Sequence, residues 1–225
     1  MGISTKRGLS ERIRVPGGPP SEELQVSKEK DMRIIAGEHR GRRLEAPRGQ
    51  GTRPTTDRVR ESLMSALVSA RGGLDDAVVL DAFAGSGALG LEALSRGASC
   101  AVFCERDREA AAVVERNIAA CRYGREAARV LRTDVLKRGA AAPGRPFDLV
   151  FLDPPYATDP AEVFGLMARL DGTGALARDV IVSYEHDAAD DRAVADGAAA
   201  AGFRIASHRH FGDTVIDLLE RLCTD

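Results

Sequence analysis

The chain has 225 residues, of which 44% are hydrophobic and 29% charged, so it is long enough to bury one substantial core. No apolar run approaches the ~20 residues of a transmembrane helix, and no apolar segment follows the first basic residues, so we expect neither a membrane span nor a signal peptide. The four cysteines form no CxxC pair, which favours reduced thiols in a cytoplasmic protein.

The net charge of −2 is unevenly distributed, at +1 over residues 1–31, +5 over residues 32–60 and −8 over the remainder. A basic arm on an acidic body is typical of proteins that bind a polyanion at one end. The alternative is a solvated, arginine-rich surface, and charge alone does not separate the two.

The first 75 residues fall into two parts. Residues 1–31 contain PGGPP and few large apolar side chains, which predicts a disordered leader. Residues 32–47 predict a short hairpin with a turn near Gly37–Gly41, and residues 53–67 a helix that Pro54 prevents from starting earlier. The apolar face of this helix is expected to leave out Arg53, Arg58 and Arg60. We therefore expect residues 32–75 to form a basic N-terminal unit.

From residue 77 onward, near-continuous apolar strands alternate with helices. The predicted strands are 77–83, 100–105, 128–134, 147–153, 179–185, 203–209 and 214–220, and the predicted helices are 88–97, 108–124, 159–170 and 191–201. This alternation predicts an α/β fold with a parallel sheet that helices cover on both faces. In such sheets ligands bind at the carboxyl ends of the strands.

The segment DAFAGSGALG (81–90) places Gly85, Gly87 and Gly90 between a strand and a helix, in a literal GxGxxG. Glycines let a backbone approach a ligand closely, and a helix N-terminus favours anions, so a dinucleotide is one interpretation. Glu105 ends the next strand and can accept hydrogen bonds from ribose hydroxyls. A nicotinamide dinucleotide and S-adenosylmethionine both carry such a ribose.

Asp81 favours S-adenosylmethionine. Its carboxylate at the tip of the first strand would repel a pyrophosphate but attract the ammonium of a methionine moiety. Asp134, after the third strand, suits an adenine amine. A glycine turn that only allows tight helix packing would explain the glycines but not three acids at strand ends.

The fourth strand ends in FLDPPY (151–156). Pro154 and Pro155 lack N–H groups and stiffen the backbone, and proline also restricts the residue before it. The Asp153 carboxylate and the Pro154 carbonyl can therefore accept both hydrogens of a planar NH2 group, while Tyr156 can stack on the ring that bears it. Holding both hydrogens frees the nitrogen lone pair for attack. The alternative is a turn that merely ends a strand and happens to contain an aromatic residue.

These residues resemble the class I methyltransferases that act on exocyclic amines, in which an Asp, Asn or Ser precedes Pro-Pro and an aromatic residue. The chain is most similar to the RsmD family. Over roughly residues 32–219 it carries, in that family's order, MRIIAG, RGRRL, RPTTDRVRESL, DAFAGSGALGLEALSRGA, ERD and FDLVFLDPPY.

The resemblance implies a Rossmann-like class I methyltransferase domain over residues 76–225, with a small N-terminal β-hairpin and helix extension. Its sheet would have seven mostly parallel strands, an antiparallel final strand, and helices on both faces. The implied reaction is S-adenosylmethionine-dependent methylation of a guanine N2 amine in 16S rRNA. The expected partner is that RNA, in the small ribosomal subunit or an assembly intermediate, and we expect a cytoplasmic monomer without membrane contact.

Site residues follow from the same resemblance. It assigns cofactor binding to Asp81, Phe83, Gly85, Ser86, Gly87, Gly90, Glu105, Arg106, Asp134 and Val135. It assigns the target amine to the catalytic group Asp153, Pro154, Pro155 and Tyr156. His39 stands where the family carries an aromatic residue, often Trp, which puts a stacking role there in doubt.

The basic arm favours a nucleic acid over a protein substrate. The candidate phosphate contacts are Arg40, Arg42, Arg43, Arg53 and Arg60. Adenine N6, cytosine N4, a non-catalytic RNA-binding assembly factor and a dinucleotide enzyme remain alternatives. The four histidines show no metal spacing with cysteines or acids, so no metal is expected, and His208 and His210 are assigned to the surface or a turn.

Overall fold

The computed structural model describes residues 32–47 and 57–222, which all belong to one compact unit, residues 31–225. The predicted leader, Arg53 and the predicted start of the first helix lie outside the described residues. None of the helices in the described part of the chain has the length and apolar character needed to span a membrane.

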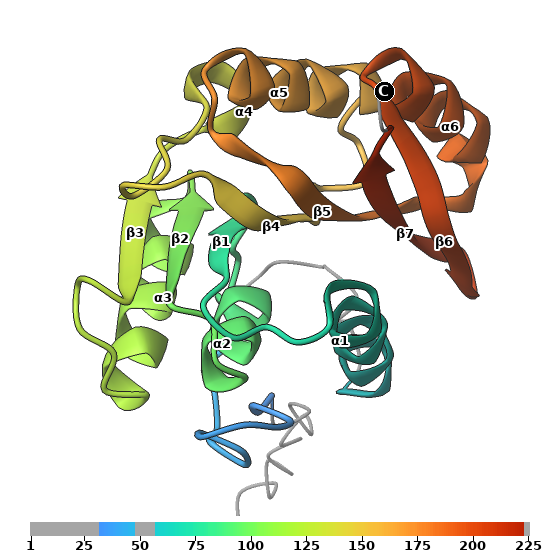
Figure 1. Cartoon of the computed structure of the whole chain (residues 1–225). Helices are drawn as coiled ribbons and strands as arrows, with labels where there is room; N and C mark the ends of the chain where they lie inside the picture. The colour runs from blue at the N-terminus through green and yellow to red at the C-terminus, as the bar shows by residue number, and fades with distance from the viewer. Residues whose placement is uncertain (1–31, 48–56, 223–225) are drawn as a thin grey trace, which may run out of the picture. The chain divides into compact units, whose positions relative to one another are not determined.

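One seven-stranded sheet forms the centre of the structure, in the order β3-β2-β1-β4-β5-β7-β6 (Figure 1). The strands are β1 (Val78–Asp81), β2 (Cys100–Glu105), β3 (Ala128–Arg132), β4 (Phe147–Leu152), β5 (Leu176–Asp187), β6 (Phe203–Phe211) and β7 (Thr214–Arg221). The pairs from β3 to β5 are parallel, and β7 lies antiparallel between β5 and β6. The predicted fold class is confirmed, including the antiparallel final strand.

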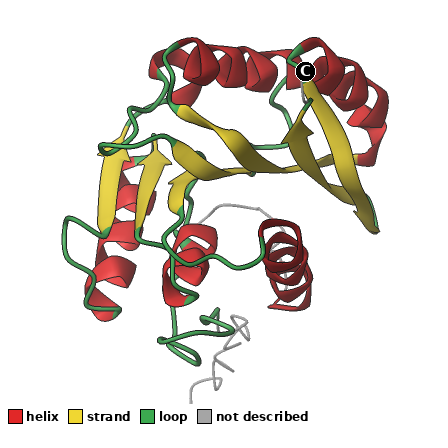
Figure 2. Cartoon of the chain, viewed as in Figure 1, coloured by secondary structure: helices red, strands yellow, loops and turns green. Residues whose placement is uncertain are grey.

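Helices cover both faces of this sheet (Figure 2). On one face lie α1 (Asp57–Arg71), α2 (Ala88–Ser95) and α3 (Arg108–Ala120); on the other lie α4 (Val135–Arg138), α5 (Pro160–Gly172) and α6 (Asp191–Ala200). Each face has its own cluster of buried apolar side chains, because the strands are apolar on both sides. Helix α4 was not predicted. Helix α1 continues beyond its predicted end, residue 67, to Arg71, and Gly72, with φ +78°, follows its last residue as glycine commonly does at a helix end.

The register brings the strand-end acids together. Asp81 pairs with Phe103 of β2 and with Phe151 of β4, so β1, β2 and β4 end at the same edge of the sheet. The same parallel register pairs Glu105 with Arg132. Side chains that follow these strands therefore share one crevice.

The predicted hairpin of the N-terminal arm (residues 32–47) is reduced to a single antiparallel bridge, Arg33 to Arg43. Around this bridge the backbone N–H groups of Ile34 and Leu44 donate to the carbonyls of Arg42 and Met32. Other hydrogen bonds join the arm to α2 and α3. The buried carboxylate of Glu92 accepts from the backbone N–H groups of Ile35 (2.8 Å) and Ala36 (3.0 Å). The arm also lies close to the last residue of α2, Ser95, and this approach requires glycine at position 37. A Cβ on Gly37, whose φ is +83°, would lie 1.7 Å from the carbonyl oxygen of Ser95.

Replacing Glu92 by Gln should loosen this attachment. One carboxylate oxygen becomes an NH2 group, so a buried backbone N–H loses its acceptor, which costs about 1–3 kcal/mol. We expect the free energy of unfolding, from urea titration, to fall by that amount. The matched control is Glu115→Gln on the exposed side of α3, which should change it by less than about 0.5 kcal/mol. Equal effects of the two variants would contradict this role for Glu92.

Candidate active site

A cavity of about 620 Å³ opens at the carboxyl edge of β1, β2 and β4. Its walls come from segments that are far apart in sequence but meet at this edge. Most of the predicted site residues line it: Asp81, Phe83, Gly85, Ser86, Glu105, Arg106, Asp134, Val135, Asp153, Pro154, Pro155 and Tyr156.

Asp81 is 2% exposed, at the wall of this cavity. The backbone N–H of Gly90 donates to its carboxylate at 3.0 Å. Burial raises the pKa of Asp81 to about 7, against the opposing effect of that hydrogen bond, and the nearby carboxylates of Asp153 and Glu105 raise it further. A cation placed beside Asp81 would reverse this effect.

Gly87 and Gly90 do not line the cavity; the structure gives them a role in packing. Gly87 precedes α2 with φ +79°, and a Cβ there would lie 3.0 Å from Val114. A Cβ on Gly90 would lie 2.4 Å from the buried ring of Phe103. These glycines let the start of α2 pack closely against α3 and β2, whereas Gly85 is the loop glycine that reaches the cavity.

Glu105 is 8% exposed and holds the glycine loop in place. One carboxylate oxygen accepts from the N–H of Gly85 (2.9 Å) and the other from the N–H of Asp107 (2.8 Å). A carboxylate has about four acceptor positions, so the predicted ribose contact remains possible beside these two bonds.

The third strand leads to another acidic position. The Asp134 carboxylate accepts from the N–H of Leu136 at 3.2 Å and so caps α4. Beside it, the buried hydroxyl oxygen of Thr133 has no hydrogen-bond partner among the described residues, although it lines the cavity. An unpaired buried hydroxyl at a cavity wall is suited to a polar ligand group.

The predicted amine-binding turn follows β4. Asp153 is partly buried, and burial raises the pKa of its carboxyl to about 6. Pro154 is buried, and the carbonyl of Pro155 accepts from the N–H of Thr158 at 2.8 Å, which closes the turn. The Tyr156 ring is 48% exposed, and its hydroxyl is 2.8 Å from that of Thr214 at the start of β7. The carboxylate and the ring thus face one cavity from a rigid segment.

Comparison with known proteins agrees with this geometry. Residues 32–220 match the family model described as "Conserved hypothetical protein 95". A curated Escherichia coli protein, ribosomal RNA small subunit methyltransferase D, is 46% identical over 125 residues, which span 56% of this chain and 60% of that protein. A Bacillus subtilis protein provisionally named as the rRNA methyltransferase YlbH is 39% identical over 69% of this chain and 83% of its own length.

Among solved structures, one from Escherichia coli, provisionally named as the methyltransferase yhhF, superposes with a TM-score of 0.70 at 36% identity. The match covers 86% of this chain and 99% of that one. The chain belongs to the RsmD methyltransferase family. This family membership confirms the predicted family and agrees with the predicted cofactor, S-adenosylmethionine.

The N-terminal arm of this RsmD family member supplies part of the cavity wall, which the sequence did not predict. Met32, Ala46 and Pro47 line the cavity. The Ser86 hydroxyl lies 3.2 Å from the Met32 sulfur, and the Asn117 amide donates to the carbonyls of Ser86 and Glu45. The sequence predicted the charge and the turn of the arm but not its position at the cavity, which depends on contacts with distant residues.

The prediction that Arg60 lies outside the buried face of α1 is wrong. Arg60 is 2% exposed and also lines the cavity. Its guanidinium donates to Asp57 at 3.0 Å and to the carbonyl of Arg33, while its Nε has no hydrogen-bond partner in the described structure. Burial lowers the pKa of Arg60, with Asp57 opposing that effect. Arg60 can therefore contact a ligand only inside the cavity.

The structure does not bring Arg40, Arg42 and Arg43 to the cavity. All three are exposed and surround a shallow hollow with Ala120, at the C-terminal end of α3. The cavity reaches Asp107 at the opposite end of that helix, but it also reaches Ser86, which the Asn117 amide contacts about one helical turn from Ala120. The hollow is therefore separate from the cavity but lies near the wall that the arm supplies. His39, near the same hollow, packs edge-on against Tyr123.

The raised pKa of Asp81 predicts a pH-dependent stability difference. The unfolded state ionises Asp81 near the ordinary value of 3.8 and the folded state only near 7. The unfolding free energy of the native protein should therefore lose a contribution as pH rises through this range. Asp81→Asn removes the titration, so its stability relative to the native protein should rise from pH 4 to pH 7 in urea titrations. The exposed control Asp179→Asn should show no such trend; a flat difference for Asp81→Asn would contradict the burial effect.

Proposed function

We propose that this chain is an S-adenosylmethionine-dependent methyltransferase that methylates the exocyclic N2 amine of a guanine in 16S rRNA. The observation that carries the proposal is that one cavity contains both the glycine loop with Asp81 and the rigid turn from Asp153 to Tyr156. The name of the Escherichia coli relative, a small-subunit rRNA methyltransferase, supports the RNA substrate. The choice of guanine N2 follows from the resemblance to the RsmD family.

The residues of the cavity fit the cofactor. When bound, S-adenosylmethionine supplies an electrophilic methyl group on a sulfonium. Asp81 has no cationic partner among the described residues, so an ammonium group would compensate its buried charge. Glu105 retains acceptor capacity for ribose hydroxyls, and the unpaired hydroxyl of Thr133 at the cavity wall would offer a polar contact to the cofactor.

The turn after β4 would hold the target amine. The Asp153 carboxylate and the Pro154 carbonyl accept the two hydrogens of the NH2 group, which favours a pyramidal nitrogen with a free lone pair. Tyr156 offers a half-exposed ring for stacking, and its hydroxyl is already fixed by Thr214. The rate enhancement would come from placement and electrostatics, since no strong base is needed before attack. A base in a duplex or structured loop would have to be flipped out to reach this turn.

We further propose that the substrate is encountered in the small subunit or an assembly intermediate, by a cytoplasmic monomer. The arginines of the arm would then contact phosphates outside the cavity, while the target base enters it. Such contacts position an RNA without reading its sequence. This arrangement suits a folded RNA better than a short single strand, because one end must reach the cavity while another part lies on the arm.

The role of Asp153 can be tested by substitution with Ala. Methyl transfer to small-subunit rRNA should fall by about 10² or more, since an electrostatic contact to the reacting group is lost. Cofactor affinity, measured by isothermal titration calorimetry, should change less than threefold, or about 0.7 kcal/mol. The matched control Asp179→Ala, an exposed aspartate on β5, should leave both quantities unchanged.

Three other outcomes of this experiment would contradict the role of Asp153, the target atom or the activity itself. Loss of cofactor affinity with normal turnover would remove Asp153 from the amine site. Methylation of adenine N6 or cytosine N4 would leave the chemistry intact but overturn the assignment to guanine N2. RNA binding without any methylated product, together with no cofactor binding, would indicate a non-catalytic assembly factor.

A second prediction concerns the arm. Arg40→Gln with Arg42→Gln should weaken RNA binding and reduce the slope of log K against log salt by about one unit per lost phosphate contact. Cofactor affinity should stay the same, because neither Arg40 nor Arg42 lines the cavity. Arg178→Gln with Arg192→Gln, at two exposed positions on β5 and α6, removes the same charge and serves as the control. An unchanged salt slope in the double variant would remove this surface from the RNA interface.

A further inference from the structure

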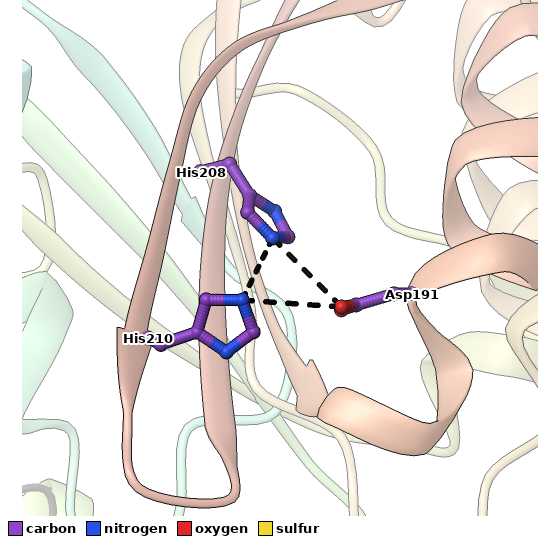
Figure 3. Close-up of side chains that lie close together, drawn as sticks. All are labelled: Asp191, His208 and His210. Carbon is purple, nitrogen blue, oxygen red and sulfur yellow. Dashed lines mark hydrogen bonds and ion pairs between the residues drawn. The ribbon is translucent and has the colours of Figure 1, made fainter.

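Two histidines and an aspartate, which the sequence did not connect, lie together on the face of the sheet covered by α6 (Figure 3). His208 and His210 are two residues apart on β6, so their side chains point to the same face of that strand. Asp191 is the first residue of α6 and points toward both rings. Both histidines are exposed, as the sequence predicted, but the sequence did not place them beside Asp191.

The ligand atoms of the three side chains form a triangle. The Nε2 atoms of the two histidines are 3.0 Å apart, and the Oδ2 atom of Asp191 lies 3.8 Å from that of His208 and 4.0 Å from that of His210. Zinc binds nitrogen and oxygen ligands at about 2.0–2.2 Å, which puts the ligand atoms of a tetrahedral site about 3.3–3.5 Å apart. Shifts of a few tenths of an ångström would bring all three atoms to bonding distance of one ion.

His208 is held in the orientation that a metal ligand requires. Its Nδ1 lies 2.6 Å from the carboxylate of Asp217, which is 1% exposed. A carboxylate accepts, so Nδ1 carries the proton and the lone pair of the neutral ring is on Nε2, facing the other two ligands. Metal-binding histidines usually donate their second ring nitrogen to a carboxylate in this way.

A further histidine stabilises Asp217. The Nε2 of His186 lies 3.1 Å from the second oxygen of Asp217, and its Nδ1 lies 2.9 Å from the carbonyl oxygen of Asp187. These two contacts fix the His186 ring beside Asp217, whose other oxygen remains the acceptor for His208.

The two carboxylate oxygens of Asp191 have different surroundings. Oδ1 is buried and lies 3.8 Å from Nδ1 of His186, whereas Oδ2 lies toward the Nε2 atoms of His208 and His210. Oδ2 is therefore the oxygen available to a metal ion.

We propose that Asp191, His208 and His210 bind one divalent transition-metal ion, with Zn²⁺ the expected occupant. Two imidazoles and one carboxylate are a ligand set typical of Zn²⁺, with solvent in the fourth position. The side chains are 38–50% exposed, so an ion can enter from solvent. The ion would join the edge strand β6 to the start of α6 and would stabilise the fold. None of the three residues lines the cavity, so this proposal is independent of the proposed methyltransferase activity.

Zinc titration of the untagged full-length chain, after removal of metals by a chelator, tests the proposal. We expect one Zn²⁺ per chain by calorimetry, and Co²⁺ at the same site should show the visible absorption of a low-coordinate complex. Added Zn²⁺ should raise the melting temperature, because an ion that binds only the folded state stabilises it. His210→Ala and Asp191→Asn should each weaken binding roughly tenfold or more and reduce the thermal shift accordingly.

Asp196→Asn is the matched control, since Asp196 lies on the same helix and is 76% exposed. This variant should bind Zn²⁺ like the native protein. Circular dichroism checks that the His210 and Asp191 variants are folded, which is expected for partly exposed positions. Absence of one-to-one Zn²⁺ binding would overturn the proposal and leave the cluster as a hydrogen-bonded histidine pair. Equal binding by the native protein and both site variants would place the ion elsewhere.

Discussion

The candidate site depends on the mutual repulsion of three carboxylates that the sheet brings to one edge. Parallel pairing of β1, β2 and β4 ends these strands at the same edge, so Asp81, Glu105 and Asp153 face one cavity. Burial and mutual repulsion raise the pKa of Asp81 to about 7, and burial raises that of Asp153 to about 6. A site of this kind favours ligands that bring a positive charge or N–H donors. The proposed cofactor brings the positive charge, and the target amine brings the N–H donors.

Much of this site could be predicted from sequence, because its parts are local. Each acid directly follows an apolar strand, and parallel strands share an edge, so Asp81 and Asp153 could be placed together without coordinates. The rigidity of the turn after β4 follows from Pro154 and Pro155 alone. The glycine loop was predicted as a unit, but Gly87 and Gly90 pack against Val114 and Phe103, and those contacts depend on the position of α3 and β2.

What the sequence could not predict depends on contacts between distant segments. The burial of Arg60 requires Asp57 and the carbonyl of Arg33 on the docked arm. The arm reaches the cavity only because Glu92 and Asn117, on two helices, hold it. His208 and Asp191 come from different elements, and no spacing rule connects them. In each case a polar side chain contacts a residue that is distant in sequence, so the contact exists only in the folded structure.

The most direct test of the central claim is a mass map of modified nucleosides in 16S rRNA from cells with and without this protein. The account predicts that one N2-methylguanosine disappears without the protein and returns when the native chain is restored, but not when the Asp153→Ala variant is supplied. An unchanged N2-methylguanosine content in the absence of the protein would contradict it.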